Sequence, residues 1–137
     1  MKRVYLDANV FISAHKEEMG RNARGLFIEA ESFFNRMQNN FILILSEFFF
    51  AEVKKHSYLS MEEVLKYFND SRIKTEIVGL KEKLLVKKYL KKGIHFSDAL
   101  HAAAAIENKC DCIVTFNTKD FEKISKEILV LEPNEFF

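Results

Sequence analysis

Two runs of apolar residues without a polar interruption, at positions 4–6 and 41–45, constrain the fold of this chain most strongly. Strands with one solvated face alternate apolar and polar residues, whereas parallel strands are covered on both faces and tend to be apolar throughout. A segment compatible with a helix follows each run. Strands that alternate with helices predict right-handed crossovers and a mostly parallel sheet.

The same alternation continues to the end of the chain. Apolar residues recur with helical spacing between Leu26 and Met37, and this helix is expected to end at Asn39 and Asn40. Further helices are predicted over 46–56, 61–68, 80–92 and 97–108, and further strands over 73–78, 112–115 and 129–131. We therefore predict one α/β domain over residues 1–137, with four to five strands in a mostly parallel sheet and helices on both faces.

Composition excludes several other classes of protein. The chain has 137 residues, 48% of them hydrophobic, which favours a folded domain over disorder. The net charge of +1 gives no bulk signal for nucleic-acid binding. Cys110 and Cys112 have neither disulfide-framework nor zinc-site spacing, and the apolar runs are too short to cross a bilayer. We expect a cytoplasmic protein that does not bind membranes.

Three of the five aspartates occupy positions that a parallel sheet brings together. Asp7 ends the first predicted strand, Asp98 lies in the first turn of the Ala-rich helix, and Asp120 follows the strand that ends at Thr115. Ligands of such sheets bind beyond the carboxyl ends of the strands. Taken singly, each aspartate has an ordinary explanation as a helix cap, a partner of a helix dipole or a turn residue.

Helix geometry favours a shared site over these separate ordinary roles. At about 100° per residue, Glu52 falls between Phe48 and Phe49, inside the apolar arc of its helix. Asp98 projects on the same face as Ala102, so it also points inward. A buried carboxylate is unfavourable unless it is paired or binds a metal ion.

The basic residues available to pair with these acids are few. His56 and His101 are the nearby candidates, and three carboxylates would have to share them. A hard divalent cation, which prefers oxygen ligands, is the more economical partner. His101 itself is expected in a supporting position or at the surface, because hard cations favour oxygen over nitrogen.

Four segments in this order resemble a PIN domain, and most closely the VapC-type toxins of prokaryotic toxin–antitoxin pairs. They are Leu-Asp-Ala-Asn at 6–9, the stretch from Ser46 to Glu52, Ser-Asp-Ala-Leu-His and four alanines at 97–105, and Val-Thr-Phe-Asn-Thr-Lys-Asp-Phe at 114–121. The likeness covers essentially the whole chain. It implies a pocket of three or four acids that binds Mg²⁺ or Mn²⁺ and cleaves single-stranded RNA.

The resemblance also assigns roles to individual positions. Asp7, Glu52 and Asp98 match the three principal acids, which in the family bind the metal and carry catalysis. Many relatives have an Asp where this chain has Asn117, so Asp120 is the expected fourth acid and Asn117 a polar contact to water or phosphate. Thr115 matches a hydroxyl at the strand end, and Asn9 a polar residue of the first loop.

Partners and substrate contacts follow with less support from the residues themselves. The resemblance implies a homodimer and an inhibiting antitoxin protein. The candidates for binding RNA phosphates are Lys54, Lys55, Lys91 and Lys92. Six lysines between 81 and 92 share one arc of their helix, but such an arc is more often an ordinary solvated face.

Other functions remain open at this stage. A phosphatase of the haloacid-dehalogenase kind also begins with a strand-end Asp, but it needs a second Asp where this chain has Asn9. A phospho-receiver domain needs an acidic pair before its first helix and is excluded on similar grounds. An RNA-processing PIN nuclease without an antitoxin and a non-catalytic PIN-like scaffold that binds RNA or protein are the remaining alternatives.

Overall fold

A parallel sheet forms the centre of the protein, as the unalternated apolar runs predict. The computed structural model describes residues 1–16, 25–37 and 40–136. The strand order is β3-β2-β1-β4-β5, and all four pairings are parallel. The strands are β1 (Lys2–Leu6), β2 (Phe41–Ser46), β3 (Thr75–Val78), β4 (Cys112–Val114) and β5 (Leu129–Leu131). The predicted fold class is confirmed.

The central strand β1 pairs with β2 on one side and β4 on the other. Val4 is opposite Leu43 of β2 and Cys112 of β4. The chain therefore builds the sheet outward through β2 and β3, and then returns to the other side of β1 to add β4 and β5. The carboxyl ends of β1 and β4 meet where this direction changes, which is the usual place for a ligand in an open α/β sheet.

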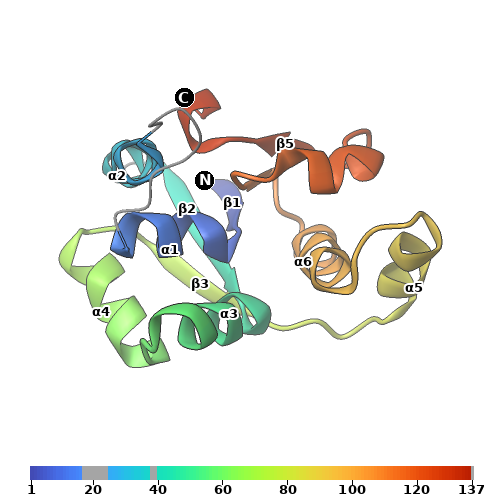
Figure 1. Ribbon diagram of the computed structural model, residues 1–137, viewed down its shortest axis with the longest axis horizontal. Helices are drawn as coiled ribbons and strands as arrows, with labels where there is room; N and C mark the ends of the chain where they lie inside the picture. The colour runs from blue at the N-terminus through green and yellow to red at the C-terminus, as the bar shows by residue number, and fades with distance from the viewer. Residues whose placement is uncertain (17–24, 38–39, 137) are drawn as a thin grey trace.

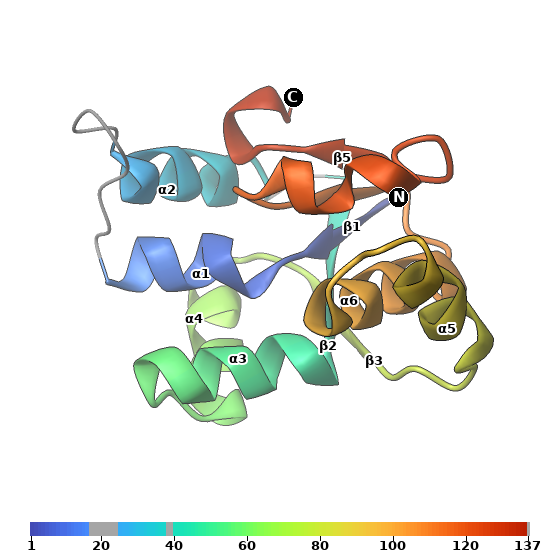
Figure 2. The same ribbon diagram turned by 45° about the vertical axis from the view of Figure 1, so that its right-hand side comes forward.

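Side chains of β1 alternate between two cores. Val4 and Leu6 are buried with α1, α2, α3 and α4, whereas Tyr5 is buried with α5 and α6. Figures 1 and 2 show these two groups of helices on opposite faces of the sheet. Helices cover both faces of the central strands, which explains why the buried positions 4–6 and 43–45 are almost all apolar.

Helices connect the strands, and none of them in the described part of the chain could span a membrane. They are α1 (Ala8–His15), α2 (Leu26–Arg36), α3 (Glu47–Ser57), α4 (Met61–Asp70), α5 (Leu84–Lys91) and α6 (Phe96–Glu107), with the 3₁₀ segments η2 (Thr118–Ile124) and η3 (Pro133–Glu135). Ser46 caps α3 by accepting the Phe49 amide at 3.2 Å, and Ser60 forms a capping box with Glu63. The expected end of α2 at Asn39 lies outside the described residues.

The predicted starts of β3 and α5 are wrong, and β3 begins at Thr75 and not at Ile73. Helix α5 begins at Leu84, four residues later than the apolar pattern indicates. The amides of Lys81 and Glu82 donate to the Glu107 carboxylate, at 2.9 and 2.6 Å, and Asn108 donates to the Gly79 carbonyl. These bonds hold the approach to α5 as a loop against the end of α6.

Candidate functional site

Asp7 follows β1, at the place in the sheet where the strand order reverses between β1 and β4. Its amide donates to the Val114 carbonyl of β4, and its carboxylate accepts the Asn9 amide at 3.4 Å, which caps α1. The side chain is only 5% exposed. Burial raises the pKa of Asp7, while the positive charge of His101 and a hydrogen bond from Thr115 lower it. The cap explains the local structure, and the burial of a carboxylate beyond a strand end indicates a second role.

A compact hydrogen-bond network fixes the outer side of Asp7. The Thr115 hydroxyl donates to Asp7 at 2.9 Å and accepts from the Asn9 side-chain amide at 3.1 Å. The backbone amide of Asn117 donates to the same hydroxyl at 3.0 Å, and the Phe116 amide donates to the Asn9 side chain. Asn9 and Thr115 thus hold the ends of β1 and β4 together and orient the Asp7 carboxylate.

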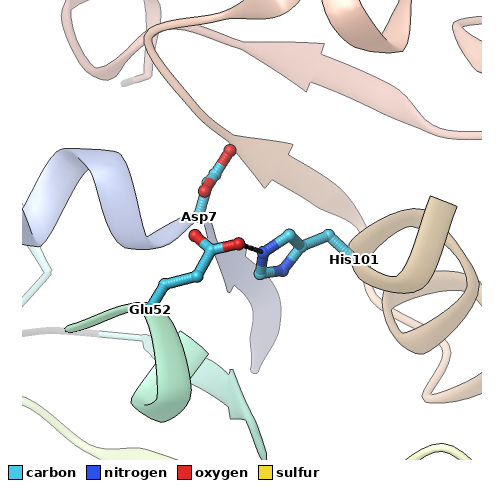
Figure 3. A group of neighbouring side chains, drawn as sticks. All are labelled: Asp7, Glu52 and His101. Atoms are coloured by element: carbon cyan, nitrogen blue, oxygen red, sulfur yellow. Dashed lines mark hydrogen bonds and ion pairs between the residues drawn. The ribbon is translucent and has the colours of Figure 1, made fainter. Parts of the chain in front are cut away.

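Glu52 and His101 reach Asp7 from the two neighbouring helices, α3 and α6. One ligand atom from each of the three side chains lies within 4.8 Å of the others. Figure 3 shows the Glu52 carboxylate between Asp7 and the imidazole of His101. His101 Nε2 is 3.0 Å from Glu52 Oε1, and the His101 side chain is 1% exposed. The helical geometry correctly predicts that Glu52 points inward, but the surface position considered for His101 is wrong.

Asp98 and Asp120 form the outer part of the same cluster. Asp98 is half-buried in the first turn of α6, and its pKa is raised to about 6 by burial and by the negative charges of Asp120, Asp7 and Glu52. Asp120 lies exposed in the first turn of η2. The negative charges of the three other carboxylates therefore all act on Asp98.

The positive charge of His101 offsets part of the repulsion between these carboxylates. Burial alone would lower the pKa of His101, but the Glu52 hydrogen bond and the charges of Asp7 and Asp98 outweigh burial and leave its pKa raised. Carboxylate oxygens that converge in a partly buried site are the ligands that Mg²⁺ and Mn²⁺ prefer. Asp7 and Glu52, whose ligand atoms lie within 4.8 Å of each other and of His101, could therefore take part in holding a divalent cation.

Two further side chains belong to the site and escaped the sequence prediction. The Tyr5 hydroxyl lies 2.6 Å from Nδ1 of His101 and 2.6 Å from the Ser46 hydroxyl, and all three side chains are buried. Tyr5 and Ser46 belong to apolar strand segments, so their sequence pattern indicates core and capping roles alone. The available signal was the position of Tyr5 two residues before Asp7, on the same side of the strand.

The lysine candidates differ in their surroundings. Lys54 and Lys55 are exposed in the last turn of α3, and Lys91 is exposed at the end of α5. Lys92 forms an ion pair with Glu127 at 3.3 Å, so part of its charge is already used within the protein. Asn117 is exposed, and its carbonyl accepts the Asp120 amide.

An apolar hollow of about 600 Å³ lies beside this site without including its acids. Phe48, Leu90 and Phe96 contribute to its lining, from α3, α5 and the start of α6. None of the four clustered acids lines it. We place the functional site at the acids, because buried converging charge needs an explanation and a shallow apolar hollow does not.

Sequence comparison agrees with this geometry. The family model of the PIN domain matches residues 4–127. The chain belongs to the PIN domain family. The match runs from β1 into the segment before β5, so it includes every acid of the cluster. No curated protein matches the chain at a significant level.

Solved structures with a similar fold include two VapBC structures. VapBC-1 from nontypeable Haemophilus influenzae matches with a TM-score of 0.63 and 21% identity, over 96% of this chain and 98% of that one. VapBC2 from Rickettsia felis, bound to a DNA fragment from its promoter, matches with a TM-score of 0.61 and 22% identity, over 95% and 97%. At this level of identity the likeness establishes the fold.

Proposed function

We propose that this PIN domain is a metal-dependent endoribonuclease that cleaves single-stranded RNA. The observation that carries the proposal is the convergence of Asp7, Glu52, Asp98 and Asp120 at the carboxyl ends of β1 and β4, where their mutual repulsion and burial raise the pKa of Asp98 to about 6. Acids held together at this electrostatic disadvantage are expected where a cation completes the site.

The four acids would bind the cation from two sides. Asp7 and Glu52 would bind Mg²⁺ or Mn²⁺ from the buried side, and Asp98 and Asp120 from the side that substrate approaches. The cation would supply water activation near neutral pH and offset negative charge on the scissile phosphate. Thr115 and Asn9 would keep the Asp7 carboxylate oriented, and exposed Asn117 would contact water or phosphate.

We further propose that the protein is the toxin of a toxin–antitoxin pair. The fold is similar along nearly its whole length to chains from two VapBC structures, which supports an antitoxin partner, and we propose a homodimer as part of the same function. An RNA-processing enzyme that acts without an antitoxin is the alternative. Copurification of a small partner protein encoded beside this chain, with loss of cleavage in the complex, would favour the toxin over the alternative.

The decisive experiment incubates purified protein with labelled single-stranded RNAs in Mg²⁺, in Mn²⁺ and in chelator. Asp7→Asn should abolish cleavage and leave the fold intact, because Asn caps a helix about as well as Asp does. Asp70→Asn, an exposed change at the end of α4, serves as the control and should cleave like the wild type. Full activity of Asp7→Asn, or cleavage that persists in chelator, would refute the proposal.

A further inference from the structure

A chain of three hydrogen bonds, two of them buried, links β1, α3 and α6 beneath the acids. It runs from Ser46 at the start of α3, through Tyr5 of β1, to His101 of α6, and returns to α3 at Glu52. Tyr5 lies two residues before Asp7, and His101 lies one helical turn after Asp98. The hydrogen-bond chain therefore connects the segments that position Asp7, Glu52 and Asp98.

Glu52 and Ser46, at the two ends of this network, fix which partner donates in each hydrogen bond. An ionised Glu52 carboxylate only accepts, so His101 Nε2 must carry a proton and donate to it. The Ser46 oxygen already accepts the Phe49 amide, which leaves its hydroxyl proton free to be donated. A tyrosine hydroxyl keeps its proton near neutral pH, so Tyr5 also has a proton to donate.

With a neutral imidazole, these constraints leave one arrangement in which every donor has an acceptor. Ser46 donates to Tyr5, Tyr5 donates to Nδ1 of His101, and Nε2 donates to Glu52. With a charged imidazole, the bond to Tyr5 reverses, but Nε2 still donates to Glu52. In both charge states the nitrogen that faces the acids is occupied by a proton and is closed to a metal ion.

We propose that His101 is a positioning residue, which orients the Glu52 carboxylate toward the metal site through Nε2 and is not itself a metal ligand. The inference rests on the proposed metal centre. One oxygen of Glu52 is held by the imidazole, and the carboxylate lies between His101 and Asp7, so its second oxygen, which accepts no hydrogen bond from the described residues, can face the cation (Figure 3). Tyr5 and Ser46 hold the ring in the tautomer that this requires.

A histidine among acids could instead bind the cation directly, and the hydrogen-bond chain argues against that role. For Nε2 to become a ligand it would have to lose its proton and its bond to Glu52. Nδ1 would then have to donate to Tyr5, and Tyr5 would have to donate to Ser46. The hydroxyl proton of Ser46 would then have no acceptor within this hydrogen-bond network. A nitrogen ligand would also favour a softer metal than Mg²⁺.

Nuclear magnetic resonance of ¹⁵N-histidine protein tests the tautomer directly. The buried His101 is distinguished from the exposed His15, His56 and His95 by its loss in a His101 variant. Above the pKa of His101, we expect a proton on Nε2 and none on Nδ1, both without metal and with saturating Mg²⁺. An unprotonated Nε2 in either condition would overturn the inference, and in the presence of Mg²⁺ it would make His101 a ligand.

Mn²⁺ affinity, measured by titration, tests the positioning role without any RNA. His101→Leu should weaken binding by roughly 10–100-fold, the usual effect of losing a residue that orients a ligand. His101→Gln should recover most of this loss, because its amide can donate to Glu52 from nearly the same place. Tyr5→Phe should weaken binding less, because Nε2 still donates to Glu52 while the ring loses the hydrogen bond that holds it at Nδ1.

The matched control is Tyr89→Phe, which removes another buried tyrosine's hydroxyl, one that donates to Glu127 away from the acids. Wild-type Mn²⁺ affinity in both His101→Leu and Tyr5→Phe would refute the inference. Should His101→Leu fail to fold, Tyr5→Phe and the tautomer measurement decide the matter. Failure of the metal centre itself is recognised separately, because wild-type and Asp7→Asn protein would then bind Mn²⁺ alike.

Discussion

Replacing Asp98 with Asn should stabilise the metal-free protein, although Asp98 is one of the proposed active-site acids. Its pKa is raised from an ordinary value of 3.8 to about 6 by burial and by the charges of Asp120, Asp7 and Glu52. At full strength that difference would correspond to about 3 kcal/mol. Because the side chain is half-exposed, solvent screening reduces the expected gain to roughly 1 kcal/mol.

The gain should depend on pH in a defined direction. The folded protein holds the Asp98 proton more tightly than the unfolded chain does, so wild-type stability falls as pH rises from about 4 to about 6. Below this window the carboxyl is neutral in both states, and Asp98→Asn should match the wild type. Above it the full difference should be present.

Urea denaturation in chelator at about pH 3 and pH 7.5 measures the free energy of unfolding at both limits. Asp70→Asn is the control, since Asp70 is exposed and paired with Lys66 at 2.9 Å, and its removal should be neutral or slightly destabilising at pH 7.5. Saturating Mn²⁺ should reverse the order at pH 7.5, because the wild type gains binding energy that the variant lacks. An Asp98→Asn protein that is less stable than the wild type in chelator at pH 7.5 would refute the account of mutual repulsion.

Three other substitutions test separate parts of the structure. Arg3→Ala removes a two-pronged pairing with Glu76, at 2.8 and 3.2 Å, and should lower the free energy of unfolding by roughly 1 kcal/mol in urea denaturation, since both side chains are partly exposed. Ser60→Ala removes the cap of α4 and should destabilise by about 1 kcal/mol, seen as a lower thermal midpoint. If Lys54 and Lys55 contact RNA phosphates, replacing both with Ala should weaken the binding of catalytically inactive protein to single-stranded RNA. The slope of log K against log salt concentration should become smaller by about 1.4. An unchanged slope would show that these lysines do not contact the RNA.

The fold is predictable because its two main signals are local. Unalternated apolar strands predict burial on both faces, and helices between them predict parallel pairing, so residues 4–6 and 41–45 are enough to indicate the sheet. The start of α5 is not predictable in the same way. Its first residues form a loop because the distant Glu107 carboxylate accepts their amides, and a local apolar pattern carries no information about that contact.

The site is predictable to the extent that it consists of charges in apolar places. Glu52 can be assigned to the buried face of α3 because a carboxylate between two phenylalanines on a helical wheel stands out. Tyr5, Ser46 and His101 cannot be joined from the sequence, because each has an ordinary role and only the packing of β1, α3 and α6 brings their polar atoms within 3.0 Å. The functions of Lys54, Lys55 and Lys91 remain predictions.

Asp7 combines a structural and a proposed catalytic role, and the two can be separated experimentally. As a helix cap it needs a side-chain oxygen for the Asn9 amide, which Asn supplies as well as Asp. As a metal ligand it needs its charge, which burial disfavours. Asp7→Asn should therefore be at least as stable as the wild type in chelator, yet gain no stability from Mn²⁺. A purely structural Asp7, held in its charged form by Thr115 and His101, would instead give a variant that is less stable in chelator, because those two partners would lose their charged acceptor.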